Sequence, residues 1–175
     1  MIFEKTILPG VFIVHVEPKV DERGFFARAW CRQEYAKEGL NTELAQCSFS
    51  GNPKKGTLRG MHYQAAPHAE AKSVRCIRGA VFDVVLDLRP QSHTFRKWLG
   101  LELTAANRDM IYIPEGCAHG FLTLEDDTEV LYQISEFYHP ESARGVRWSD
   151  PAFQIAWPAP PEVISERDQT YPDFQ

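Results

Sequence analysis

The stretch GTLRGMHYQ, residues 56–64, holds the side chains best suited to chemistry in this sequence of 175 residues. It runs from a lysine- and glycine-rich turn into a strand-like segment. His62 has two cations near it in sequence, Arg59 and Lys72, and with a neighbouring tyrosine this set could bind an anion and move a proton. A lone histidine is more often half-buried and satisfied by a hydrogen bond. The function of His62 therefore depends on the rest of the chain.

Three further motifs carry residues of the same kind. In PEGCAHGF, His119 lies beside glycines at the start of a predicted strand. In LYQISEFYHP, Tyr132 and Tyr138 are separated by an even number of positions, so an unbroken strand would present both side chains on one face. SERD places Asp168 in a late polar segment. Each motif also has a purely structural interpretation, because strand tyrosines are often core residues, a glycine-flanked histidine can serve a turn, and aspartates are common at helix ends.

Short strands separated by turns must position these side chains. Segments of alternating or β-branched residues recur along the chain, and glycine, proline, asparagine and aspartate mark the turns between them. Many short strands are typical of a β-sandwich or barrel, and no linker or repeat divides the sequence, so we expect one domain over residues 1–175. Strands are predicted at residues 11–17, 24–30, 42–50, 56–64, 73–78, 80–87, 96–103, 109–113, 119–124 and 129–137, with a polar turn at 18–23 and a helix at 32–39.

The spacing of Arg59 and His62 makes a specific structural demand. Successive side chains of a strand point to opposite faces, so residues three apart on a regular strand point away from each other. If both line one pocket, a β-bulge near Gly60, or the end of the strand, must redirect one of them.

Composition and charge argue against several classes of protein. The net charge of −5 and the isoelectric point near 5.7 argue against nucleic-acid binding. The opening residues do not resemble a signal peptide and no apolar run is long enough to cross a bilayer, so a cytoplasmic location without membrane contact is expected. The four cysteines form no Cys-x-x-Cys pair, so we expect reduced thiols and no zinc motif.

One predicted strand, VFDVVLDL at residues 81–88, is apolar on both faces over part of its length. A sandwich interior accounts for one face. The other face needs a cover, which is either a partner subunit or a second sheet of the same chain.

Taken together, the motifs resemble the dTDP-4-dehydrorhamnose 3,5-epimerase family, cupin-type enzymes of deoxysugar biosynthesis. Each motif is weak alone, but their shared order along most of the chain is highly specific. The matching segments are DERGFF, GTLRGMHYQ, the lysine at position 72, VRCIRGAVFDVVLDLR, IPEGCAHGF, LYQISEFYHPES and SERD.

The resemblance implies an all-β fold, the cupin jelly-roll β-sandwich with a few short helices, and a homodimer that exchanges N-terminal strands. It also implies that neither a metal nor another cofactor is needed. The residues agree, because a metal-binding cupin carries His-x-His with a later glutamate and histidine, whereas Tyr63 and Gln64 follow His62. Neither His68 nor Glu70 restores that spacing.

The implied activity is inversion of C3, C5 or both in a 4-keto-6-deoxyhexose linked to a nucleoside diphosphate. The carbonyl acidifies the hydrogens on these carbons, so the reaction needs a base on one face, an acid on the other and a cation near the developing oxyanion. By the resemblance, His62 is the base and Asp168 orients it. Lys72 stabilises the enolate, and Tyr132 returns the proton from the opposite face. Substrate binding is expected at Arg23, Phe26, Gln46, Ser48, Arg59, His119, Tyr138 and Arg167.

Three positions depart from the family pattern. Members with thymidine substrates commonly carry a glutamate, an asparagine and a glutamate where this chain has Arg28, Ser48 and Ala143. These positions are assigned to the nucleotide and its diphosphate. The sequence therefore leaves open whether the nucleotide is dTDP, CDP, GDP or UDP, and which carbon is inverted.

Two other functions fit the same fold. A ketoisomerase would move the carbonyl between C3 and C4 by way of the same acidified hydrogens, but Tyr132 at the acid position argues against it. Loss of His62, Asp168 or Tyr132 would favour a sugar- or metal-binding cupin without catalysis, and none is lost. The sequence therefore favours an isomerase.

Overall fold

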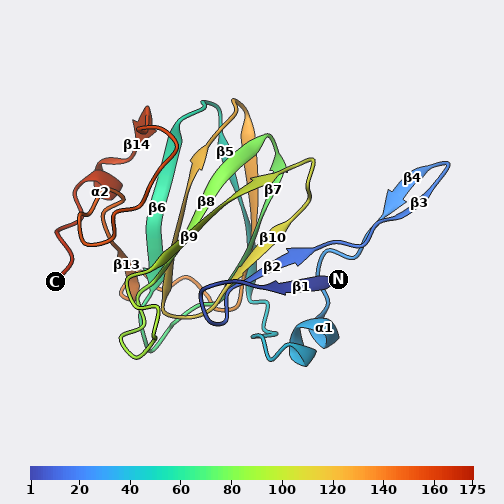
Figure 1. Cartoon of the computed structure of the whole chain (residues 1–175), viewed down its shortest axis with the longest axis horizontal. Coiled ribbons are helices and arrows are strands. Elements are labelled where there is room, and N and C mark those ends of the chain that lie inside the picture. The colour runs from blue at the N-terminus through green and yellow to red at the C-terminus, as the bar shows by residue number, and fades with distance from the viewer.

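Two β-sheets face each other across a shared apolar core in the computed structural model, which describes residues 1–175 (Figure 1). One sheet has the strand order β1-β2-β10-β7-β12-β5, and the other has the order β13-β6-β11-β8-β9, with β14 paired to β6. Strands that are neighbours in a sheet are mostly distant in sequence, because the chain crosses repeatedly between the sheets as in a jelly roll. The predicted all-β class and the cupin jelly-roll sandwich are confirmed.

The strands are short, and two short helices lie outside the sandwich. The first sheet contains β1 (Ile2–Lys5), β2 (Phe12–His15), β10 (Met110–Ile113), β7 (Lys72–Arg78), β12 (Thr128–Ile134) and β5 (Gln46–Asn52). The second contains β13 (Ala143–Gly145), β6 (Thr57–Gln64), β11 (Cys117–Thr123), β8 (Ala80–Asp87), β9 (Trp98–Thr104) and β14 (Val163–Ile164). The remaining elements are the hairpin strands β3 (Lys19–Asp21) and β4 (Gly24–Phe26) and the helices α1 (Arg32–Lys37) and α2 (Glu166–Gln169). Neither helix is long or apolar enough to span a bilayer.

The main core lies between the sheets. Val74 and Val130 project from the first sheet and meet Val81, Val85 and Phe121 from the second, and all five are fully buried. Alternation along each strand sends these side chains inward, and burying each one contributes about 1.5–3 kcal/mol. The core thus fixes the position of one sheet relative to the other, and with it the side chains that the two sheets turn toward each other.

The outer face of β8 is covered by the C-terminal part of the same chain. Val84 and Leu86 point away from the main core and pack in a second buried cluster with Val146 and Phe153, against which Trp157 also packs. Neither of the two predicted covers, a partner subunit or a second sheet, is therefore found here. The cover is mostly irregular chain, which carries no strand pattern in its sequence.

The segment after β2 also differs from the prediction. The sequence predicts a polar turn at residues 18–23 and a strand at residues 24–30, but β3 and β4 form a short hairpin that projects from the sandwich (Figure 1). Residues 27–30 form no strand. Val20 and Phe26 are each 77% exposed on this hairpin, so two large apolar side chains have no cover within the single chain.

Candidate active site

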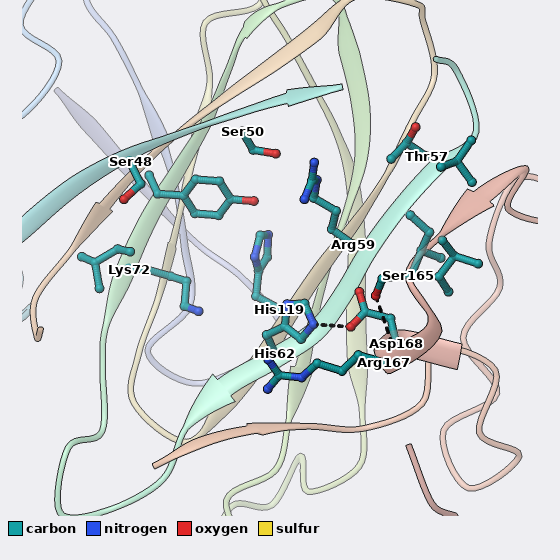
Figure 2. Close-up of a pocket in the computed structure, with 15 residues that line it drawn as sticks. Ser48, Ser50, Thr57, Arg59, His62, Lys72, His119, Ser165, Arg167 and Asp168 are labelled. Atoms are coloured by element: carbon teal, nitrogen blue, oxygen red, sulfur yellow. Dashed lines mark hydrogen bonds and ion pairs between the residues drawn. The ribbon is translucent and has the colours of Figure 1, made fainter. Parts of the chain in front are cut away.

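A cavity of about 650 Å³ opens between the two sheets. Side chains from β6 and β11 line one side, those from β5, β7 and β12 line the other, and β14 and α2 border it (Figure 2). Eight of the predicted site residues line this one cavity: His62, Tyr132, Asp168, Lys72, Ser48, Arg59, His119 and Arg167.

His62 and Asp168 form a hydrogen-bonded pair in the cavity wall. His62 Nε2 bonds Asp168 Oδ1 at 2.7 Å (Figure 2). The Gly60 backbone N–H donates to Asp168 Oδ2 at 3.2 Å. Burial opposes the ionisation of Asp168 most strongly, but the bonds from His62 and Gly60 outweigh it and hold its pKa below the ordinary value. A carboxylate only accepts hydrogen bonds, so it keeps the proton on Nε2 and leaves Nδ1 as the free base.

The C-terminal segment brings Asp168 to His62 although 106 positions separate them. β14 runs parallel to β6 and pairs Ile164 with Leu58. Ser165 then caps α2, because its Oγ accepts the Asp168 N–H at 3.1 Å. This short turn directs the Asp168 carboxylate, which is 5% exposed, at the imidazole, which is 40% exposed and reaches the cavity.

The predicted irregularity near Gly60 is present. The pairing of β11 with β6 shifts register between His119↔His62 and Phe121↔Arg59, and Arg59 and His62 both line the cavity. Gly60 has φ +134°, and a Cβ at this position would lie 2.5 Å from the Gly120 Cα. Only glycine fits where the two backbones approach so closely. The register shift at Gly60 turns the Arg59 and His62 side chains to the same side of the sheet.

Lys72 enters the cavity from the start of β7, on the sheet opposite His62. Its Nζ lies 2.6 Å from the Glu70 carboxylate, and the side chains are 7% and 11% exposed. The sequence does not predict this pairing of Glu70 with Lys72. A buried ammonium group held by one carboxylate has further donors for an oxygen in the cavity.

His119 belongs to a second histidine–aspartate pair. Its Nε2 bonds Asp83 Oδ2 at 2.8 Å, and the two side chains are 4% and 0% exposed. Sequence reasoning missed Asp83, although an acidic residue in the apolar β8 strand signals a buried partner. The Tyr132 ring lies 6.0 Å from the His119 ring, nearly perpendicular to it.

Tyr132 is set up to hold its proton. Burial raises the pKa of its phenol far above the ordinary value, and the nearby Asp83 charge raises it further, while Arg59 lowers it to a lesser extent. The phenol therefore stays protonated at neutral pH and has a proton to donate.

Two arginines are held at the rim of the cavity. Arg59 Nε donates to Asn52 Oδ1 at 2.7 Å, and Asn52 is 2% exposed, so the guanidinium is directed by a buried amide. Arg167 Nε donates to the Tyr171 hydroxyl at 2.8 Å. With Ser48 on the facing β5, this rim is suited to bind the oxygens of an anion.

Four predicted site residues do not line the cavity of the single chain. Arg23 and Phe26 lie on the projecting hairpin, where the Arg23 side chain is 82% exposed and pairs with Asp21. Gln46 Oε1 accepts the Tyr138 backbone N–H at 3.2 Å. Strand β12 ends at Ile134 instead of continuing to residue 137, so Tyr138 lies beyond it and not on an unbroken strand with Tyr132.

The cavity does not gather a set of metal ligands. Each of its histidines already bonds an aspartate, and the only group of three potential ligands within 4.8 Å of one another is His68, His139 and Glu141, none of which lines the cavity. The cavity instead places a basic imidazole on one sheet and a protonated phenol and an ammonium group on the other. A carbon acid bound between the sheets can lose a proton to one side and gain one from the other.

The chain matches the sequence model of a family described as dTDP-4-dehydrorhamnose 3,5-epimerase over residues 5–175. It is 44% identical over 167 residues to a Shigella flexneri protein of that name, covering 94% of this chain and 91% of the relative. The crystal structure of the Elizabethkingia anophelis protein of that name superposes with a TM-score of 0.95 at 38% identity, covering 99% of this chain and 96% of that chain. The Bacillus anthracis structure, described with TDP and PPi bound, superposes with a TM-score of 0.94 at 32% identity and 98% coverage of both chains.

Proposed function

The chain belongs to the dTDP-4-dehydrorhamnose 3,5-epimerase family, and from this premise we propose that it inverts C3, C5 or both of a 4-keto-6-deoxyhexose linked to a nucleoside diphosphate. It is an isomerase that works through an enolate. The observation that carries the proposal is the position of the His62–Asp168 pair on one sheet of the cavity and of Tyr132 and Lys72 on the other.

Proton removal begins on the side of β6. The C4 carbonyl acidifies the hydrogens on C3 and C5, and the free Nδ1 of His62 takes one of them. The electron pair of that C–H bond moves into the enolate, whose oxygen bears the charge. Asp168 stabilises the imidazolium that forms, because its carboxylate bonds the other ring nitrogen at 2.7 Å.

Protonation completes the inversion from the other sheet. The Lys72 ammonium group stabilises the oxyanion at C4, a kind of interaction whose removal typically costs about 10²–10³-fold in rate. Tyr132 donates its phenolic proton to the opposite face of the same carbon, and the C–H bond reforms with inverted configuration. Solvent and His62 then exchange protons, and Tyr132 is reprotonated for the next turnover.

The substrate's diphosphate binds at the rim of the cavity. Arg59 and Arg167 supply positive charge there, and Ser48 supplies a hydroxyl group. We assign dTDP as the nucleotide, because the relatives carry it in their names and TDP is bound in the Bacillus anthracis structure. Arg28, Ser48 and Ala143 depart from the family pattern at positions assigned to the nucleotide and its diphosphate. The preference for dTDP should therefore be tested against CDP, GDP and UDP sugars.

The working unit proposed is a homodimer of one-domain chains, residues 1–175, in the cytoplasm. The exposed apolar hairpin of β3 and β4 supports an exchange of N-terminal strands, in which Arg23 and Phe26 reach the cavity of the partner subunit. Gln46 and Tyr138, which bond each other beside the cavity, would then complete the nucleotide end.

The test is incubation with a 4-keto-6-deoxyhexose nucleotide in deuterated water, followed by NMR of the product. The proposal predicts deuterium at C3, C5 or both, with inversion at the labelled carbon and no change after treatment with a chelator. His62→Ala abolishes the labelling. A product with the carbonyl at C3 would identify a ketoisomerase, and binding without any exchange would identify a sugar-binding protein; either result overturns the proposal.

A further inference from the structure

A cluster of two histidines and a glutamate lies outside the cavity. The rings of His68 and His139 stack with centroids 3.5 Å apart and planes 6° apart. Glu141 Oε1 lies 3.1 Å from His139 Nδ1 and 3.9 Å from His68 Nε2. The proposed reaction uses none of these three residues.

The backbones that carry the two histidines are fixed to each other by Gln64, the last residue of β6. Its Nε2 donates to the carbonyl oxygens of His68 and Phe137, each at 3.0 Å, and its Oε1 accepts the His139 N–H at 2.6 Å. Gln64 is 3% exposed, so these bonds are shielded from water. The segments on either side of the cluster are therefore held together before any ligand binds.

We propose that His68, His139 and Glu141 form a binding site for a divalent transition-metal ion of the Zn²⁺ type. Two imidazole nitrogens and one carboxylate oxygen are a ligand set that Zn²⁺ takes in proteins, with a fourth position left to water. The three ligand atoms lie within 4.8 Å of one another. The inference does not rest on the proposed function, because the cluster is outside the cavity.

The movement needed to bind an ion is small. Bonds of about 2.0–2.1 Å place tetrahedral ligand atoms roughly 3.3 Å apart, so the group of ligand atoms, now within 4.8 Å, must contract by about 1.5 Å at most. The Glu141 side chain is 66% exposed and free to rotate, and the imidazoles are 33% and 29% exposed and can tilt about their side-chain torsions. The site is thus preorganised in its backbone and adjustable in its side chains.

The competing account is that Glu141 only pairs with a protonated His139. That account does not explain why the His68 ring stacks on His139 with its Nε2 3.9 Å from the same carboxylate oxygen. Both rings lie near one carboxylate oxygen, which places two imidazole nitrogens and that oxygen within reach of a single ion.

The test is calorimetric titration of the metal-free full-length chain with ZnCl₂. We expect one ion per chain, and at least a tenfold loss of affinity in both His68→Gln and His139→Gln. Glu141→Gln, at an exposed position that cannot disturb the core, should also weaken binding. Visible absorption of the Co²⁺-loaded chain should show the bands of a tetrahedral ion, and these bands should be absent in His139→Gln.

Two control variants separate this cluster from other histidines. His15→Gln removes a histidine that contacts Glu4 and Asp109 on the surface, and His62→Gln removes one from the cavity. Both should bind Zn²⁺ like the unmodified chain. The proposal is overturned if the chain takes up no Zn²⁺, or if His68→Gln and His139→Gln bind it with unchanged affinity.

Discussion

Replacement of Asp168 by asparagine removes one charge from the site with almost no change in shape. The asparagine amide oxygen can still accept the Gly60 N–H, which Asp168 Oδ2 accepts at 3.2 Å. Its NH₂ group then faces His62 Nε2, where a carboxylate oxygen lies at 2.7 Å in the unmodified chain. Because that group donates, it favours the tautomer with the proton on Nδ1 and blocks the nitrogen assigned as the base.

The expected loss follows from the role of the base. General base catalysis typically contributes about 10²–10⁴-fold, so we expect kcat to fall about 10³-fold, which corresponds to about 4 kcal/mol in the barrier. KM should change little, because Asp168 is 5% exposed behind His62 and the arginines at the rim are untouched. A fall in kcat without a rise in KM is the pattern for an interaction made mainly in the transition state.

The assay is the initial rate of deuterium incorporation into the 4-keto sugar, measured by NMR at several substrate concentrations. Glu166→Gln, an exposed position in the same helix, serves as a matched control and should keep the full rate. Thermal unfolding of both variants establishes that the fold is intact. A kcat within threefold of the unmodified chain for Asp168→Asn would refute the reasoning.

Three further predictions follow from buried groups. Lys72→Met should lower kcat about 10²–10³-fold and, by stranding the Glu70 carboxylate, destabilise the fold by about 3–5 kcal/mol; adding Glu70→Gln should restore the thermal midpoint but not the rate. Asp87 is buried, yet bonds from Arg89 and two hydroxyl groups hold its pKa below the ordinary value of 3.8. The ionised Asp87 therefore stabilises the folded chain fully above pH 3.8, and this contribution to the free energy of unfolding is lost as the pH falls below that value. The free energy of unfolding in urea, measured from pH 5 to pH 2, should therefore fall less steeply with pH for Asp87→Asn than for the unmodified chain. An equal fall in both proteins would contradict this. Iodoacetamide at pH 8 should modify the exposed Cys47 but not Cys117, because burial raises the pKa of the Cys117 thiol to about 12. Mass spectrometry of the native protein measures the labelling of each cysteine, and equal labelling of the two would contradict this.

Which residues gather at the cavity was largely predictable from the sequence, because eight of the predicted site residues, from short motifs, line it. The parity of Arg59 and His62 predicted a break in β6, and the register shift at Gly60 provides it. The roles given to the cavity residues stay predictions until the experiments above are done.

The partners of two cavity residues were not predictable, because they depend on three-dimensional packing. Asp83 meets His119 only through the pairing of β8 with β11, and Glu70 meets Lys72 through the course of an irregular loop. The strand bearing Tyr132 ends at Ile134, and the next residue, Ser135, accepts the Ala71 N–H on its Oγ at 2.8 Å. These two residues lie 64 positions apart, so the contact carries no periodic signal in the sequence.

The central claim is that a base on β6 and an acid on β12 act on opposite faces of one sugar carbon. The most direct test is Tyr132→Phe incubated with the 4-keto sugar nucleotide in deuterated water, with exchange and configuration followed together by NMR. We predict that deuterium still enters through His62 while inversion falls by at least 10²-fold. Inversion at the unmodified rate, or loss of exchange and inversion in equal measure, would contradict the claim.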